Sequence, residues 1–131
     1  MRIDIKKFGE LCEMELEDFI SEMFSGTGYA INPKSDAEYD ATKAAVEYAY
    51  AKEDITVEKI FAHMLTNGKT LVVTDPERKD HDFTIETLEE GLDRLLQKAP
   101  EVFRDFVHGN NDLCSAMALI DCAIFGEVVY G

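Results

Sequence analysis

Apolar side chains recur every three or four residues along several stretches of the chain, which is the spacing of an amphipathic helix. The first of these stretches covers residues 8–24, and a glycine-rich segment that favours a helix end follows it. A second stretch, at about 36–52, follows Ser35, which forms a capping-box pattern with Glu38. Its apolar positions form an alanine-rich face, which permits close helix packing: Ala37, Ala41, Ala44, Ala45, Tyr48 and Ala49. The amphipathic Tyr39, Tyr48 and Tyr50 are expected at the margin of this face.

The same periodicity predicts four more helices in the second half of the chain. Thr56 caps one that runs to about Leu65, and Thr84 or Thr87 starts another, which ends before Pro100. The expected core residues of these two are Ile60, Phe61, Met64, Leu65, Leu88, Leu92, Leu95 and Leu96. A short helix follows at 101–108. The last one, at 113–125, is apolar on nearly all sides, so we expect it to lie buried at the centre of the core.

Two short β-prone segments flank a polar turn and predict a β-hairpin at about 69–85. Two strands alone are marginally stable in water. The hairpin must therefore pack on helices or gain a third strand, for which Met1–Ile5 and Tyr29–Ile31 are candidates. The expectation is a single domain over 1–131, of a mainly helical α+β class. Five to six helices would surround the buried C-terminal helix.

Several short segments stand out as motifs: 67–71 followed by 83–92, Glu17–Phe19 followed by Gly26–Tyr29, and the end of the chain, 121–131. The end is the most specific, because its last seven residues read Phe-Gly-Glu-Val-Val-Tyr-Gly. In these segments the chain resembles small uncharacterised proteins of prophages, phages and conjugative elements of gut bacteria. The resemblance implies an accessory gene of a mobile genetic element. It implies no activity and no catalytic residues.

Composition narrows the class of protein further. The 131 residues are 46% hydrophobic, and 27 acidic side chains stand against 13 Lys plus Arg, which gives a formal net charge of −14. The hydrophobic share argues against intrinsic disorder. A run of the ~18 apolar residues that a membrane span needs is absent, and so is a basic nucleic-acid footprint. We therefore expect no membrane insertion and no direct nucleic-acid binding.

The first residues of the chain and its cysteines indicate in which cellular compartment the protein is expected. Charged and apolar residues alternate from Met1 to Lys7, which differs from the apolar run of a secretory signal. The three cysteines, Cys12, Cys114 and Cys122, form an odd set without a short repeated spacing. We therefore expect reduced thiols and a cytoplasmic protein.

Charge is concentrated in the first predicted helix, where six acids occur without a base: Glu10, Glu13, Glu15, Glu17, Asp18 and Glu22. One interpretation is a solvated helix face. The alternative is mimicry of nucleic acid, since duplex DNA carries one charge per ~1.7 Å of its axis. The candidate interaction surface thus includes Glu10, Glu13, Glu17 and Asp18. Val129 and Tyr130 complete it, because this β-prone, extended end could join the hairpin, join a partner's sheet, or dock on its own domain.

The sequence contains few residues that could form a metal, cofactor or catalytic site. The histidines (His63, His81 and His108) and the cysteines lack the closely spaced pairs of structural zinc sites, so no metal is predicted and the cysteines of the last helix are read as core residues. The glycine-rich segment lacks the Lys-Ser/Thr of a phosphate loop, and no cofactor is predicted. Asp121 differs, because it interrupts the most apolar helix. It requires a partner such as Arg94, Arg104 or a backbone N–H, or else it lines a pocket or an interface.

Three functional hypotheses follow. The first is a non-enzymatic accessory protein of a mobile element that binds another protein, alone or as a homodimer. The second is an acidic mimic of nucleic acid that inhibits a host defence enzyme. The third is a small ligand-binding module or enzyme, which needs a pocket that holds Asp121 or a histidine. The sequence names neither the partner nor the reaction.

Overall fold

The computed structural model describes Ile20 and residues 28–107 and 113–129. Its elements in chain order are strand β1 (Ala30–Pro33), helix α3 (Asp36–Ala49), the 3-10 turn η1 (Lys52–Asp54), α4 (Val57–Thr66), β2 (Leu71–Thr74), β3 (Asp80–Phe83), α5 (Ile85–Lys98), α6 (Pro100–Val107) and α7 (Leu113–Phe125). The described part is thus mainly helical with one small sheet, which confirms the predicted α+β class.

The sheet is antiparallel, with the strand order β1-β2-β3. The predicted hairpin is confirmed as β2 and β3, and its third strand is β1, which begins within the second candidate segment, Tyr29–Ile31. The other candidate, Met1–Ile5, lies outside the described residues. Ile31, Val73 and Phe83 all turn inward and are almost fully buried. One face of the sheet is therefore part of the core.

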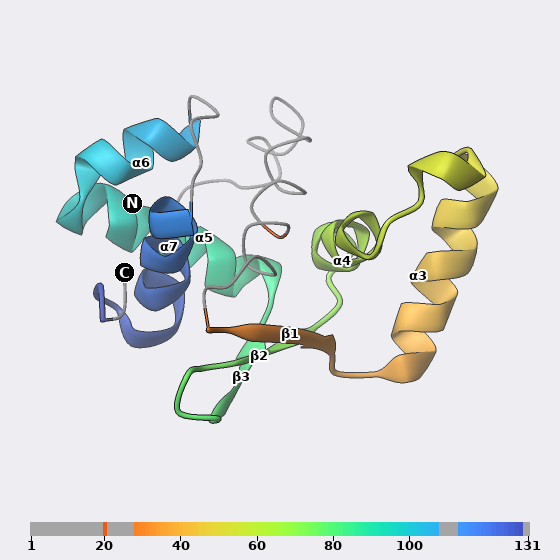
Figure 1. Ribbon diagram of the computed structural model, residues 1–131, viewed down its shortest axis with the longest axis horizontal. Helices are drawn as coiled ribbons and strands as arrows, with labels where there is room; N and C mark the ends of the chain where they lie inside the picture. Colours follow the sequence, from red (N-terminus) through yellow and green to blue (C-terminus); the bar gives the residue numbers. More distant parts are fainter. Residues whose placement is uncertain (1–19, 21–27, 108–112, 130–131) are drawn as a thin grey trace.

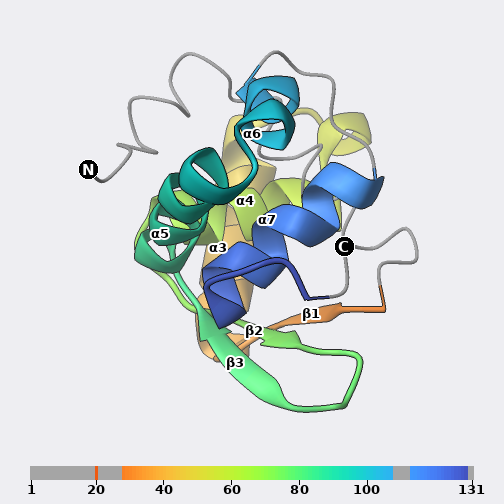
Figure 2. The same cartoon turned by 90° about the vertical axis from the view of Figure 1, so that its left-hand side faces the viewer.

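The helices divide into two groups about this sheet. Figure 1 shows α5, α6 and α7 on one side, α3 on the other, and α4 between them. Figure 2 shows α7 beside α5 and above the sheet. A Cβ atom on Gly91 of α5 would lie 2.6 Å from the Cβ of Ala123, so these two helices approach closely at that point. Leu119 and Ile120 of α7 are fully buried, as predicted for a central helix.

Helix starts follow the predicted caps. The Ser35 hydroxyl accepts a hydrogen bond from the Glu38 N–H at 3.3 Å, and Thr56 accepts one from the Lys59 N–H at 3.1 Å. Thr84 forms a full capping box with Thr87 at the start of α5. Each cap pairs an N–H group that the first helical turn leaves without a partner inside the helix. The chain therefore specifies these boundaries locally.

The predicted inward face of α3 is wrong. Its alanines and Tyr48 are all exposed, and the buried residues of this helix are Thr42 and Val46. Apolar residues cover so much of the α3 circumference that periodicity could not show which part faces the core. Packing against α4 and β1 selects the line through Val46, which has a larger apolar side chain than alanine to bury. Leu96 of α5 was also predicted inward and is 37% exposed, because α7 packs on the neighbouring face of α5.

Candidate binding surface at the C-terminal corner

Asp121 lies in the middle of the buried part of α7, with 0% of its surface exposed. Its Oδ1 accepts a hydrogen bond from the Tyr29 hydroxyl, and its Oδ2 accepts one from the Val129 N–H at 3.0 Å. A buried carboxylate requires such donors, since burial removes its hydration. This carboxylate therefore ties the segment before β1 and the segment after α7 to the core.

The observed hydrogen-bond donors to Asp121 match only some of those that the sequence predicts. A backbone N–H was one expected donor, and Val129 supplies it. Arg94 was another, but its guanidinium donates instead to the carbonyl oxygens of Cys122 and Ala123, at 3.1 and 3.2 Å. Arg104 is exposed on α6. The sequence missed Tyr29, for which the available signal was a tyrosine within an apolar segment, because a buried phenol needs a hydrogen-bond partner.

A second buried carboxylate, Asp75, organises the turn between β2 and β3. It is 4% exposed, and its Oδ1 accepts from the N–H groups of Glu77 and Lys79 at 2.8 and 3.0 Å. Its Oδ2 lies 2.9 Å from Nε2 of His81. The His81 hydrogen bond, followed by that of the Lys79 N–H, lowers the pKa of Asp75 below its usual value near 3.8. His81 thus positions the turn, a role for which the sequence offered no signal.

His81 also connects the hairpin to the end of α7. Its ring meets the ring of Phe125 edge to face, with centroids 5.6 Å apart and an interplanar angle of 80°. Gly126 follows Phe125 with a positive φ of 80° and ends the helix, and its N–H bonds to the Cys122 carbonyl at 3.1 Å. A left-handed glycine at this position is a common helix stop. The chain therefore turns sharply after Phe125.

Three apolar side chains project from this turn. Phe125 is 38% exposed, Val128 is 41% exposed and Val129 is 49% exposed. We use the name C-terminal corner for this surface and the groups that hold it: Tyr29, Asp75, His81, Asp121, Phe125, Val128 and Val129. The corner combines a buried polar interior with an apolar tip.

The end of the described chain differs from the extended segment that the sequence predicts. Residues 126–129 bend, and within the described part no strand includes them. The reason is local, because the Val129 N–H bonds to the Asp121 carboxylate and not to a neighbouring strand. Within the described residues, this hydrogen bond ties the backbone at Val129 to its own domain, and the side chains of Val128 and Val129 stay exposed.

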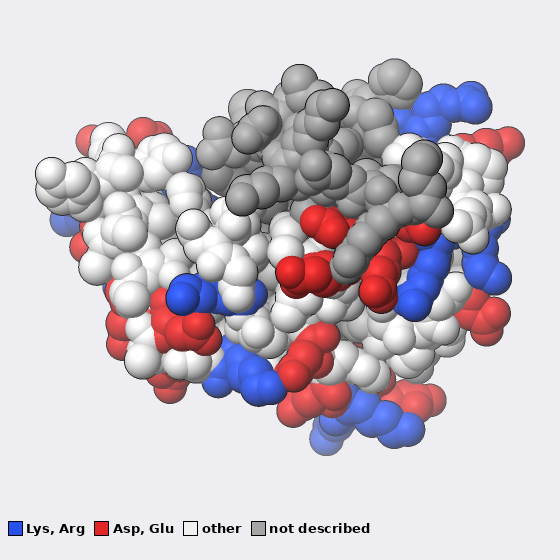
Figure 3. Space-filling model, turned by 180° about the vertical axis from the view of Figure 1, so that it is seen from behind, with Lys and Arg blue, Asp and Glu red and all other residues white. Residues whose placement is uncertain are grey.

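The remaining surface candidates, Glu10, Glu13, Glu17, Asp18 and Tyr130, lie outside the described residues. Over the part of the surface that the structure describes, Lys and Arg side chains lie beside the acidic ones on most of the face seen in Figure 3. Ion pairs join several of them, including Lys34 with Asp82 at 2.6 Å. The acidic patch on which mimicry of nucleic acid depends is not among these residues, so that hypothesis stays a prediction.

The cysteines separate into two environments. Cys122 is fully buried, and burial, with a smaller contribution from the charge of Asp121, raises the pKa of its thiol. Cys114 is exposed, contrary to the prediction that both cysteines of this helix are core residues, since it lies in the first turn of α7. No cluster of three metal-ligating side chains occurs within 28–107 and 113–129. Cys12 and His108 are not among the described residues.

Comparisons with protein-family models, curated proteins and solved structures found nothing that matches this chain. Among the described residues, no helix is both long enough and apolar enough to cross a membrane. The C-terminal corner therefore has to be interpreted from its own geometry.

Proposed function

We propose that the chain binds another protein through the apolar tip of the C-terminal corner. One observation carries this proposal: the fully buried carboxylate of Asp121 holds the backbone at Val129, while the side chains of Val128 and Val129 remain exposed. A segment that is already held in place loses little conformational entropy when it binds a partner. The proposal includes the context that the resemblance implies, an accessory protein of a mobile element, and the cytoplasmic location that the sequence predicts.

The shape and chemistry of the tip favour a protein partner over a small molecule. Small-molecule sites are concave and surround their ligand, whereas the side chains of Phe125, Val128 and Val129 are each at least 38% exposed. Aromatic and apolar side chains are typical of the centres of protein interfaces, where charged residues are depleted. The proposed partner therefore offers an apolar recess that covers these three side chains.

A capture experiment with charge-matched variants tests the proposal. The wild-type chain and the Val129→Asp variant would be immobilised and exposed to a lysate of the host cell. Val57→Asp is the control, because Val57 is 45% exposed at the start of α4, away from the corner. The expected result is a protein that the wild type and Val57→Asp retain and Val129→Asp loses, with unchanged thermal melting of all three.

Two results would contradict the proposal. If Val129→Asp and the neutral variant Val128→Ser retained the same protein as the wild type, the tip would not be the contact surface. If the purified chain instead converted a small molecule at an enzyme-like rate, and one pocket substitution removed that rate, the function would be catalytic.

A further inference from the structure

Strand β3 is an open edge of the sheet within the part of the chain that the structure describes. It comes last in the strand order β1-β2-β3. The Asp75 N–H bonds to the Lys79 carbonyl oxygen at 2.9 Å, and such bonded pairs recur at every second position of an antiparallel ladder. The backbone groups of His81 therefore face β2, whereas those of Asp80 and Asp82 face away from it. Both aspartates are exposed, so their N–H and C=O groups are accessible to a partner.

The opposite edge of the sheet, β1, is closed to such a partner. The Lys34 N–H bonds to the Thr70 carbonyl oxygen at 3.2 Å, so the alternate residues Ile31 and Pro33 face away from β2. Ile31 is 5% exposed, and a proline has no N–H to donate. Of the two edges, β3 is therefore the one that can receive a further strand.

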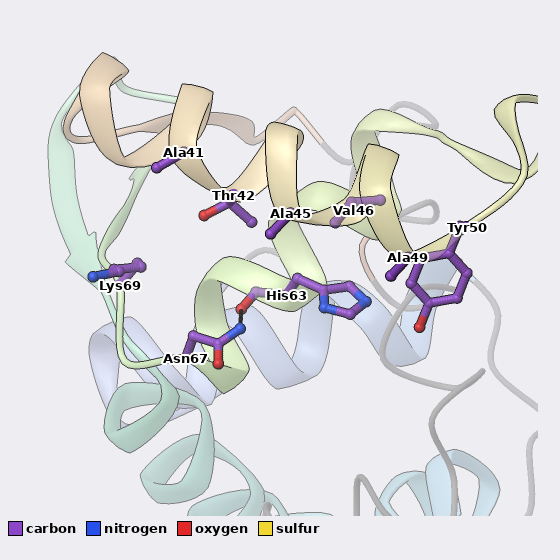
Figure 4. Close-up of a pocket in the computed structure, with 9 residues that line it drawn as sticks. All are labelled: Ala41, Thr42, Ala45, Val46, Ala49, Tyr50, His63, Asn67 and Lys69. Atoms are coloured by element: carbon purple, nitrogen blue, oxygen red, sulfur yellow. Dashed lines mark hydrogen bonds between the residues drawn. The ribbon is translucent and has the colours of Figure 1, made fainter.

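The groove between α3 and α4 does not specify an occupant in the same way. It has a volume of about 440 Å³, and Figure 4 shows small α3 side chains along one wall. Lys69 of this groove is already ion-paired with Glu38, with Nζ 3.6 Å from the carboxylate. At the β3 edge the backbone itself specifies what fits, because N–H and C=O groups spaced along a strand are paired by another strand.

The outer face of the β3 edge is acidic. Asp80 and Asp82 share this face, since alternate residues of a strand point the same way. The Thr74 hydroxyl donates to Oδ1 of Asp80 at 2.7 Å, and Nζ of Lys34 lies 2.6 Å from Oδ2 of Asp82. Lys79 pairs with the turn and alternates to the other face. Lys34 thus balances one of the two negative charges, and the other can attract a basic side chain.

The inner face of the same edge lies beside the end of α7. The His81 ring meets the Phe125 ring with centroids 5.6 Å apart, and Phe125 is 38% exposed. Figure 2 shows the end of α7 above β3. A strand added at β3 therefore directs alternate side chains towards Phe125, which belongs to the apolar tip of the C-terminal corner.

We propose that β3 receives an extended segment of the partner protein as an added antiparallel strand, basic on its outer face and apolar on its inner face. This inference rests on the proposed function, because Phe125 belongs to both surfaces, and it specifies the chemistry of the partner. Basic side chains lie opposite Asp80 and Asp82, and an apolar one lies opposite His81. A second copy of β3 is excluded, since a twofold pair places aspartate beside aspartate, and like charges opposite each other are destabilising.

A titration with methylated peptides tests the backbone contact. The probe is the peptide Ser-Lys-Val-Lys-Val-Ser, blocked at both ends, and amide NMR of the wild-type chain follows its binding. The amide signals of Asp80 and Asp82 should shift, and their exchange with solvent should slow. In an antiparallel pair, backbone N-methylation of both lysines removes the N–H groups that face β3, whereas methylation of both valines alters N–H groups that face away.

The two methylated peptides have the same composition and charge, so they isolate the hydrogen bonds. The lysine-methylated peptide should bind at least about tenfold more weakly than the valine-methylated one. Any other order of the two, or unchanged Asp80 and Asp82 signals at millimolar concentrations of the unmethylated peptide, overturns the proposal.

Two substitutions at Asp82 separate the backbone contact from the charge. Asp82→Pro removes the N–H that faces the added strand and spares the ladder with β2, so it should weaken peptide binding at least about tenfold. Asp82→Asn keeps the N–H and should weaken binding less than about fivefold. Equal weakening by the two variants contradicts strand addition. Thermal melting shows whether the proline variant folds, and the methylated peptides decide the question on the unaltered chain if it does not.

The peptide titration and the capture with Val129→Asp can fail separately. The titration reports on the β3 edge, and the capture reports on the tip. If the capture is lost with Val129→Asp while the peptide leaves Asp80 and Asp82 unchanged, the tip binds a protein and strand addition is wrong. If the peptide binds as expected while Val129→Asp retains the captured protein, the tip is not the contact surface and the strand site remains.

Discussion

The C-terminal corner and helix α3 are held by different means. The corner surrounds two carboxylates, Asp121 and Asp75, whose hydrogen bonds reach the segment before β1, the hairpin turn and the segment after α7. Helix α3 is as long as α5, yet only Thr42 and Val46 are buried along it. The corner is thus stabilised by contacts between distant parts of the sequence. Most of α3 relies on its own helical hydrogen bonds and one line of packing.

This difference shows that the length and apolar content of a segment do not predict how much its tertiary contacts stabilise it. An alanine-rich helix has good intrinsic helix propensity, so α3 needs little tertiary support to form. Residues 126–129 lack regular structure, and one buried carboxylate holds them. Substitutions should therefore be costly in the corner and tolerated on the exposed side of α3. The predictions below run from the largest expected effect to the smallest.

Removing the Asp121 carboxylate should have the largest effect. Asp121→Ala leaves the Tyr29 hydroxyl and the Val129 N–H without their acceptor, so the free energy of unfolding should fall by about 3 kcal/mol. Urea denaturation measures this change. Glu127→Ala, next to the corner but exposed, is the control and should differ little from the wild type. A loss below that of an ordinary surface substitution would show that Asp121 does not hold the corner.

Adding one methyl group between α5 and α7 should also be costly. In Gly91→Ala the new Cβ would lie 2.6 Å from the Ala123 Cβ and 2.9 Å from its Cα, so the helices must separate. Overpacking of this kind costs roughly 2 kcal/mol, which exceeds the gain in helix propensity. Thermal melting tests it, and a stabilised variant would contradict the close approach. The paired variant Gly91→Ala/Ala123→Gly should recover part of the loss, since it removes the Cβ that clashes.

Acid should weaken the hairpin turn through Asp75. Its pKa is lower in the folded chain than in the unfolded chain, so its contribution to stability is complete above the unfolded value. That contribution is lost as pH falls below about 4 and through the folded pKa. Asp75→Asn should reduce this dependence on pH. Urea midpoints measured through the acid range check it, and an equally steep acid dependence in the variant would exclude Asp75 as a cause.

A substitution on the exposed side of α3 should have the smallest effect on stability. Tyr48 is 96% exposed, so Tyr48→Ser should change the free energy of unfolding of the monomer by no more than about 0.5 kcal/mol. Val46→Ala on the same helix is the comparison and should cost more, because Val46 is 1% exposed. If the two variants lost equal stability, α3 would be covered more evenly than the structure shows.

The sequence by itself determined the local structure of this protein. Hydrophobic periodicity, caps such as Thr84 and turn residues located the hairpin and the helices from α3 to α7, since each signal acts within a few residues. The predicted helix at 8–24 lies outside the described residues and stays a prediction. It also showed that Asp121 needs a partner, because a carboxylate inside an apolar helix cannot remain without one.

Only the tertiary structure decided which partner Asp121 has, that His81 holds the hairpin turn, and which face of α3 is buried. Each of these depends on residues far apart in the chain. Tyr29, for example, meets Asp121 across 92 positions, and no local pattern encodes such a contact.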